Sequence, residues 1–143
     1  MTLTLEIFWG SILLGLCTFV HLTIVFSAVK ILHKMKEAMA ARTFIVQFGI
    51  TIGVALICII FAHTLQVWFW AGSFLFLDIS SNVESSVYFA LATYTTVGYG
   101  DVVAQEGSRV FASIASVTGL LSFGISTAFL VGVFAEILPE EKE

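Results

Sequence analysis

Three long stretches without Asp, Glu, Lys or Arg dominate this sequence of 143 residues. They run from residue 7 to 29, from 43 to 77 and from 110 to 135, which is 23, 35 and 26 residues. A helix needs ~20 mostly apolar residues to cross the hydrocarbon core of a bilayer. With only 11% charged residues, the chain also lacks the charge that covers a water-soluble domain. We therefore expect an all-α membrane protein with three transmembrane helices.

The middle stretch is longer than one membrane crossing requires. As a single helix its 35 residues would reach ~52 Å, against a hydrocarbon core of ~30 Å. We therefore expect this helix to cover residues 43–70, with Trp68, Phe69 and Trp70 at the headgroup level. Ala71-Gly72-Ser73 is then a plausible break in the helix.

The segment between the second and third stretches is too short to cross a membrane. Ser81 or Asn82 can cap a helix there, with Glu84 in its first turn. A helix over residues 83–95 would be ~20 Å long, so it can enter the hydrocarbon core without leaving on the far side. Such a re-entrant helix needs protein or a water-filled cavity around it. Its C-terminal end would direct partial negative charge into the membrane, which suits a cation.

Basic residues predict the orientation of the chain in the membrane. Four of the six lie between the first two stretches: Lys30, Lys34, Lys36 and Arg42. Because loops rich in Lys and Arg stay in the cytoplasm, we expect residues 1–42 to form a transmembrane helix followed by a cytoplasmic basic loop. The N-terminus would then be extracellular, and a short acidic tail over residues 139–143 would be cytoplasmic.

Residues 95–101 read Thr-Thr-Val-Gly-Tyr-Gly-Asp and resemble the selectivity filter of potassium channels. The resemblance extends over about residues 44–137 and implies a pore domain over residues 43–138. Its parts would be an outer helix (43–70), a pore helix (83–95), the filter (95–101) and an inner helix (109–138). The resemblance also implies that K+, with no other cofactor, binds the backbone carbonyls of Thr96, Val97, Gly98 and Tyr99 and the Thr96 hydroxyl.

Several neighbours would support such a filter. Gly98 and Gly100 accept the positive φ that carbonyls pointing to one axis require. The resemblance further implies that Tyr99 braces the filter against the pore helix. Related channels often carry two tryptophans and a glutamate in that helix, at positions where this chain has Tyr88, Phe89 and Ala92. With Thr95, Gly100 and Asp101, these residues form the predicted filter support, and we expect its outer end to be braced differently.

The third stretch carries candidate gate residues. Gly119 lies where related channels have a hinge glycine. Two interpretations are open for it: a hinge in this helix, or close packing against a neighbouring helix. Helical spacing from that point predicts one face toward the cavity and the inner mouth, formed by Leu120, Phe123, Thr127, Val131, Phe134 and Ala135. Glu136 and the glutamates after it would form an acidic ring in a tetramer, or simply end a helix in solvent.

Two histidines lie in the spanning stretches, where an ionisable side chain is a functional candidate. His63 is either a neutral, hydrogen-bonded side chain or a proton sensor, and His21 lies in the first stretch. No stretch carries Arg or Lys at every third position, so the sequence predicts no voltage sensor of the usual kind. The stimulus for gating and the role of the first helix do not follow from the sequence.

These features predict a potassium-selective channel of the cell membrane, tetrameric around a central pore. One chain supplies one filter loop where the family uses four, so we expect a homotetramer surrounded by lipid. The alternatives are a non-conducting or regulatory channel-like subunit, a non-selective cation channel and a transporter subunit. The sequence contains no nucleic-acid-binding pattern and no cluster typical of an enzyme.

Overall fold

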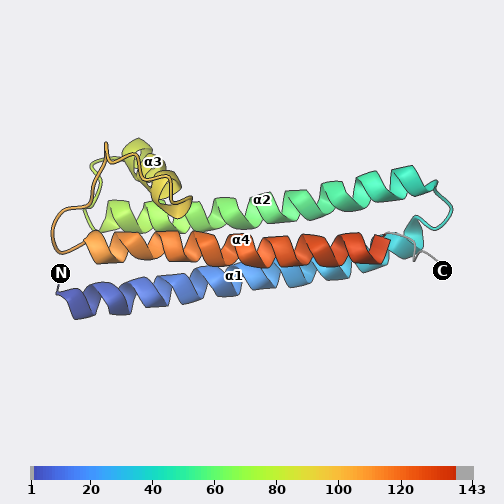
Figure 1. Ribbon diagram of the computed structural model, residues 1–143, viewed down its shortest axis with the longest axis horizontal. Coiled ribbons are helices and arrows are strands. Elements are labelled where there is room, and N and C mark those ends of the chain that lie inside the picture. The colour runs from blue at the N-terminus through green and yellow to red at the C-terminus, as the bar shows by residue number, and fades with distance from the viewer. Residues whose placement is uncertain (1, 138–143) are drawn as a thin grey trace.

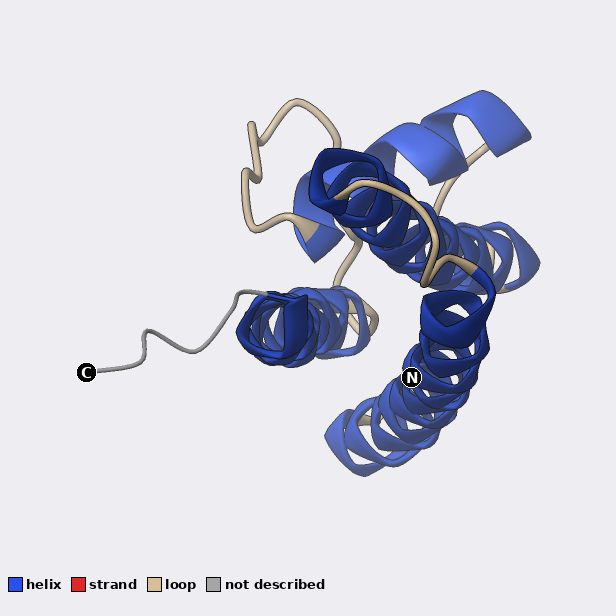
Figure 2. Ribbon diagram, turned by 90° about the vertical axis from the view of Figure 1, so that its right-hand side faces the viewer, coloured by secondary structure: helices blue, strands red, loops and turns tan. Residues whose placement is uncertain are grey.

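The computed structural model describes residues 2–137, and the regular structure in this range is entirely helical. Three long helices run alongside one another, and a short helix packs against one end of the bundle (Figures 1 and 2). The short helix contacts two of the long ones, α2 and α4. In chain order the elements are α1 (Leu3–Ala38), α2 (Phe44–Phe76), α3 (Val83–Tyr94) and α4 (Arg109–Ile137).

The three long helices are each apolar enough to cross a membrane. Their most apolar windows have mean hydropathies of 2.3 for α1, 2.6 for α2 and 1.9 for α4. No proline interrupts residues 2–137, so each helix continues without a break in its hydrogen bonding. The prediction of an all-α chain with three candidate membrane spans is confirmed.

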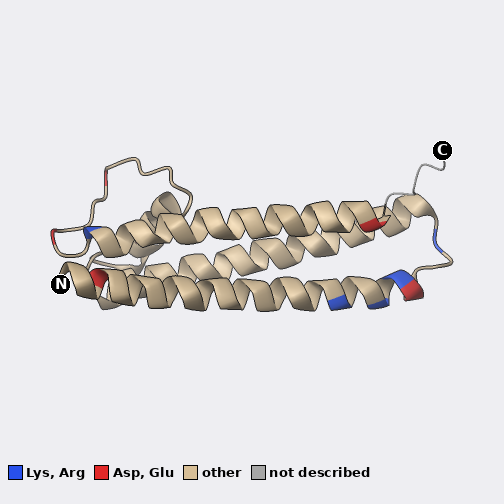
Figure 3. Cartoon of the chain, turned by 60° about the horizontal axis from the view of Figure 1, so that its bottom comes forward, with Lys and Arg blue, Asp and Glu red and all other residues tan. Residues whose placement is uncertain are grey.

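Helix α1 is longer than expected, and this corrects the predicted basic loop. Lys30, Lys34 and Lys36 lie on the last turns of α1, and only Arg42 of the four lies in the connection to α2. Lysine is a good helix former, so a charged end does not stop the helix. The connection is held by the Gln47 side chain, which donates to the carbonyls of Met39 at 2.9 Å and Arg42 at 3.0 Å. Figure 3 shows that basic residues gather at this end of the bundle.

Helix α2 also runs past its predicted end. The expected break at Ala71-Gly72-Ser73 is not observed, because the helix continues to Phe76. The cause is tertiary packing: Trp70 and Phe74 are both fully buried, and their rings lie 5.4 Å and 6.2 Å from the ring of Phe111 in α4. Trp70 therefore belongs to the core, whereas Trp68 is 53% exposed, as a residue at the headgroup level would be.

Two apolar clusters hold the bundle together, one at each end. The cluster next to α3 contains Trp70, Phe74, Phe89, Tyr94 and Phe111, with smaller side chains around them. The cluster at the other end joins α1, α2 and α4 and comprises Ala28, Leu32, Ala55, Ile59, Phe129 and Val133. Polar side chains meet between these clusters.

Helix α3 begins at the predicted cap. The Asn82 side chain accepts a hydrogen bond from the Ser85 backbone N–H at 2.9 Å, which satisfies one of the free donors of the first turn. Glu84 lies in the same turn, where its charge complements the helix dipole. The 12 residues of α3 span ~18 Å and end at Tyr94, one residue before the predicted end.

Candidate functional site

Residues 95–101 follow α3 directly, and their backbone alternates in handedness. Thr96, Gly98 and Gly100 have φ values of 62°, 51° and 80°, whereas the residues between them have negative φ. The sequence predicted positive φ at the two glycines but not at Thr96. A β-branched residue rarely adopts this conformation, so the surrounding structure must hold it there.

Hydrogen bonds from the start of this segment return to the last turn of α3. The Thr95 hydroxyl donates to the Leu91 carbonyl at 2.6 Å, and the Thr96 N–H donates to the Thr93 carbonyl at 3.0 Å. The Gly98 N–H donates to the Ala92 carbonyl, also at 3.0 Å. Ala92 therefore supports the segment through its backbone, which a prediction from side chains alone could not find.

The carbonyls of this segment are free of internal partners. Within residues 2–137, no donor is hydrogen-bonded to the carbonyl oxygen of Thr96, Val97, Gly98 or Tyr99. Backbone carbonyls are strong acceptors that need water, a cation or another donor. The side chains of Val97 and Tyr99 are 52% and 74% exposed, so the predicted bracing by Tyr99 is not made within one chain.

The outer end of the segment is fixed by Tyr88 and Asp101. The Tyr88 hydroxyl donates to Asp101 Oδ2 at 2.5 Å, and the Val102 N–H donates to Oδ1 at 3.0 Å. The hydrogen bond from Tyr88 is the main reason why the pKa of the Asp101 carboxyl is lower than usual. The same bond is the main reason why the pKa of the Tyr88 hydroxyl is raised. Phe89, the next residue, packs on Phe74 instead, with ring centroids 5.0 Å apart.

Helix α4 contacts and supports the C-terminal end of α3. The Ser116 hydroxyl donates to the Thr93 carbonyl at 2.8 Å. Gly119 lies against the Tyr94 carbonyl so closely that a Cβ at this position would overlap the carbonyl oxygen. Of the two interpretations of Gly119, this contact favours close packing. Ser116 was missed by the sequence analysis, because a serine in an apolar helix has no distinguishing neighbour.

The predicted gate face of α4 is exposed in the single chain. All six side chains have more than a third of their surface uncovered: Leu120, Phe123, Thr127, Val131, Phe134 and Ala135. Two of them also contact α2, because Phe123 stacks on His63 at 4.5 Å and Phe134 lies 6.0 Å from Phe48. The face is therefore available to a cavity or to another copy of the chain, and its role in gating stays a prediction.

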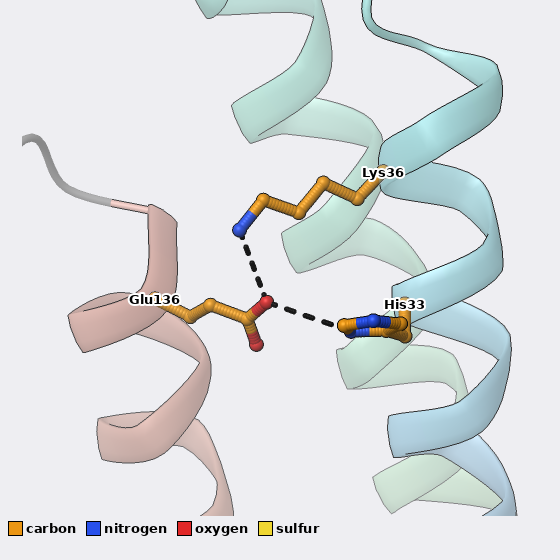
Figure 4. A network of polar contacts seen from close by, with 3 residues as sticks. All are labelled: His33, Lys36 and Glu136. Carbon is orange, nitrogen blue, oxygen red and sulfur yellow. Dashed lines mark hydrogen bonds and ion pairs between the residues drawn. The ribbon is translucent and has the colours of Figure 1, made fainter.

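At the opposite end of the bundle, Glu136 is paired within the chain (Figure 4). Its carboxylate accepts a hydrogen bond from Lys36 Nζ at 3.1 Å and lies 3.9 Å from Nδ1 of His33. Both partners lie on α1, so His33 is a helix residue rather than part of a loop. The other predicted members of an acidic ring, Glu140, Glu141 and Glu143, lie outside the described residues.

Comparison with known proteins agrees with this geometry. A family model described as "Ion channel" matches residues 63–136, which is just over half of the chain. The matched range begins in α2, contains all of α3 and the 95–101 segment, and ends near the last turn of α4. No curated protein and no solved structure matches the sequence.

Proposed function

The chain belongs to the ion-channel family, and from this premise we propose that it is a channel that conducts K+ passively and selectively through a homotetrameric pore. Ion channels are transporters rather than enzymes. The observation that carries the proposal is the backbone of residues 95–101. Its handedness alternates at Thr96, Gly98 and Gly100, and four successive carbonyls have no partner within the described chain.

This backbone suits a dehydrated cation. An ion that leaves water loses its hydration shell, and the cost in a low-dielectric medium is prohibitive without replacement oxygens. Rings of backbone carbonyls supply those oxygens in potassium channels. In the proposed filter, the carbonyls of Thr96, Val97, Gly98 and Tyr99 bind K+, and the Thr96 hydroxyl completes the innermost site.

A ring of carbonyls requires more than one chain. Each chain supplies a single filter segment, and four symmetric copies are the arrangement that known filters use. The exposed side chains of Val97 and Tyr99 and the exposed face of α4 support assembly, since each would gain contacts with a neighbouring copy. In that assembly α3 is the re-entrant pore helix, surrounded by α2 and α4 rather than by lipid.

The distribution of charge supports an orientation in the cell membrane. Lys30, Lys34 and Lys36 at the end of α1 and Arg42 beyond it lie at the end of the bundle opposite α3 (Figure 3). By the positive-inside rule this end is cytoplasmic. The N-terminus and the filter then face the extracellular side, and the C-terminus faces the cytoplasm.

Reconstitution into liposomes with opposing K+ and Na+ gradients tests the proposal. We expect a reversal potential that follows the K+ gradient alone. A reversal potential that follows Na+ equally would overturn selectivity, and a tetramer without any flux would indicate a non-conducting subunit.

A pair of variants links the flux to the filter backbone. Gly98→Ala places a side chain at a φ of 51°, so it should abolish selective flux. Gly53→Ala, in α2 where a Cβ meets nothing within 4 Å, should leave the flux unchanged. Equal flux from both variants would mean that the 95–101 segment is not the conducting path.

A further inference from the structure

A ring of six polar side chains crosses the middle of the bundle, and its member Tyr94 also belongs to the apolar cluster next to α3. Every helix contributes to it: His21 from α1, His63 and Gln66 from α2, Tyr94 from α3, and Ser122 and Ser126 from α4. His21, Gln66 and Ser122 are completely buried, and Ser126 is 5% exposed. Such side chains are costly in an apolar environment unless each finds a partner.

Five hydrogen bonds link the members of the ring. Gln66 Nε2 lies 2.6 Å from His21 Nδ1, and His21 Nε2 lies 3.0 Å from Ser126 Oγ. Ser126 Oγ is also 3.1 Å from His63 Nε2, whose ring contacts the Tyr94 hydroxyl through Nδ1 at 2.7 Å. The Tyr94 hydroxyl lies close to Ser122, which donates to Gln66 Oε1 at 2.8 Å, so the six side chains form a ring.

The amide of Gln66 sets the direction of every bond. Its oxygen accepts from Ser122, so its N–H donates to His21 Nδ1, and the proton of His21 must therefore lie on Nε2. That N–H donates to Ser126. The Ser126 hydroxyl then donates to His63 Nε2, and the His63 proton lies on Nδ1, which donates to Tyr94. A 180° rotation of the amide reverses all five bonds and keeps each of them.

The linked hydrogen bonds have two consequences for the histidines. In either direction the two histidines are neutral and carry their protons on opposite nitrogens. An added proton would turn an acceptor nitrogen into a donor and break the ring.

Within residues 2–137, no carboxylate is hydrogen-bonded or ion-paired with a member of the ring to compensate such a charge. A further titratable side chain at the ring is the buried thiol of Cys17, which lies close to Tyr94. Glu6 precedes His21 by 15 residues on α1, or ~22 Å of helix. Arg109, at the start of α4, precedes Ser122 by 13 residues, or ~20 Å.

We propose that His21 is a positioning residue for the filter, acting through the uncharged ring on Tyr94. The inference rests on the proposed channel function and assigns a role to the first membrane helix. Tyr94 is the last residue of α3, and the filter begins directly after it. Hydrogen bonds through Ser126 and His63 join His21 to the Tyr94 hydroxyl. A second arm, through Gln66, places Ser122 close to the same hydroxyl.

Removal of His21 would act on Tyr94 without any contact between the two. Ser126 would lose the group that donates to it and Gln66 the nitrogen that accepts from it, so two buried groups would be short of a partner. Neither the side chains on the Ser126 side nor those on the Gln66 side would then determine whether the Tyr94 hydroxyl donates to His63 or accepts from it. The entrance of the filter would consequently be held less firmly.

Solid-state NMR of the ¹⁵N-histidine-labelled full chain in lipid vesicles tests the ring directly. We expect His21 and His63 to be neutral at neutral pH and to carry opposite tautomers; His33→Ala identifies the signal of the histidine outside the ring. In His21→Ala, the tautomer populations of His63 should change, because Ser126 loses its bond to His21. Identical tautomers in the wild type, or an unchanged His63 signal in His21→Ala, would overturn the ring.

K+ flux from the same vesicles tests the effect on the filter. We expect His21→Ala and Ser126→Ala to lower the ratio of K+ to Na+ flux by about 5-fold or more, the lower range of ordinary coupling between sites. Ser113→Ala is the matched control, because this exposed serine of α4 bonds only to its own helix at Arg109. Circular dichroism of each variant separates this effect from unfolding.

The outcomes separate this inference from the proposed function. A wild-type chain that conducts no K+ overturns the channel function and with it the positioning role, whatever the NMR result. A conducting wild type with an equally selective, folded His21→Ala overturns only the positioning role. Loss of selectivity in Ser113→Ala as well would show that any serine replacement in α4 has this effect, which also counts against the ring.

Discussion

The Tyr88 hydroxyl donates a hydrogen bond to the Asp101 carboxylate across 2.5 Å, which joins the first half of α3 to the residue that ends the filter. The position behind the filter that carries an acid in some related channels is Ala92 here. Its carbonyl instead binds the Gly98 N–H. A side-chain bond at Asp101 and a backbone bond at Gly98 are therefore among the contacts that brace the proposed filter.

Tyr88→Phe removes this hydroxyl and keeps the ring. Because a charge-assisted hydrogen bond is lost at an exposed site, we expect the fold to survive and the filter to close or inactivate several-fold faster. Single-channel recording or the decay of K+ flux measures this rate. Phe89→Leu is the control, since Phe89 packs on Phe74 and not on Asp101. Equal decay in wild type and Tyr88→Phe would contradict the bracing role.

The same pair predicts a pH dependence with two limits. The Tyr88 bond lowers the pKa of Asp101, so its stabilising effect is full above the usual pKa of ~4 and is lost as pH falls through the lower value. The pKa of Tyr88 is raised, so on the alkaline side the stabilising effect of the bond is full below ~10 and is lost as pH rises through the raised value. Inactivation should therefore accelerate at both extremes, and Tyr88→Phe should remove the alkaline limit. A wild type with no acid limit would contradict this assignment.

Glu6 of α1 fixes the first turn of α4. Its carboxylate is 4% exposed and accepts the backbone N–H groups of Val110 at 2.9 Å and Phe111 at 3.2 Å. We expect Glu6→Ala to lower the free energy of unfolding by about 1–3 kcal/mol, because two buried donors lose their acceptor. Thermal melting in detergent measures this, with Glu6→Gln expected to lose less and the exposed Glu106→Ala almost nothing. A melting temperature of Glu6→Ala equal to that of Glu106→Ala would count against the cap.

Glu136 is turned toward α1 by its bond to Lys36, so we expect it to contribute little charge to the inner mouth. Glu136→Gln should leave K+ conductance at low salt unchanged, since the carboxylate it removes is already paired. Both side chains are more than half exposed, and the pair contributes at most about 1 kcal/mol to stability. A clear fall in low-salt conductance for Glu136→Gln would restore the acidic-ring interpretation.

Hydropathy was enough to predict the three long helices, because this signal is local in the sequence. The motif at residues 95–101 is local in the same way, and its role as a filter stays a prediction. The end of α2 could not be predicted in this way. Ala71-Gly72-Ser73 has the composition of a break, yet Trp70 and Phe74 pack on Phe111, some 40 positions later in the chain, and the helix continues.

The polar ring also could not be predicted from the sequence, although His21 and His63 were candidates as ionisable residues in apolar stretches. Its bonds join residues between 31 and 105 positions apart, for example His63 with Tyr94 and His21 with Ser126. No local spacing links such residues. Small residues such as serine commonly allow close packing of membrane helices, and the structure shows that Ser122 and Ser126 also form hydrogen bonds.

Gly119 and Gly124 provide a matched pair for testing the support of α3 by α4. A Cβ at Gly119 would overlap the Tyr94 carbonyl, whereas a Cβ at Gly124 meets nothing within 4 Å. Gly119→Ala must push α4 away from the end of α3, so we expect it to lower the melting temperature and to abolish selective K+ flux. Gly124→Ala should keep both, and greater stability is possible because alanine favours the helix by about 1 kcal/mol. If Gly119→Ala conducted like Gly124→Ala, α4 would not support α3 through this contact. That result would favour the interpretation of Gly119 as a hinge.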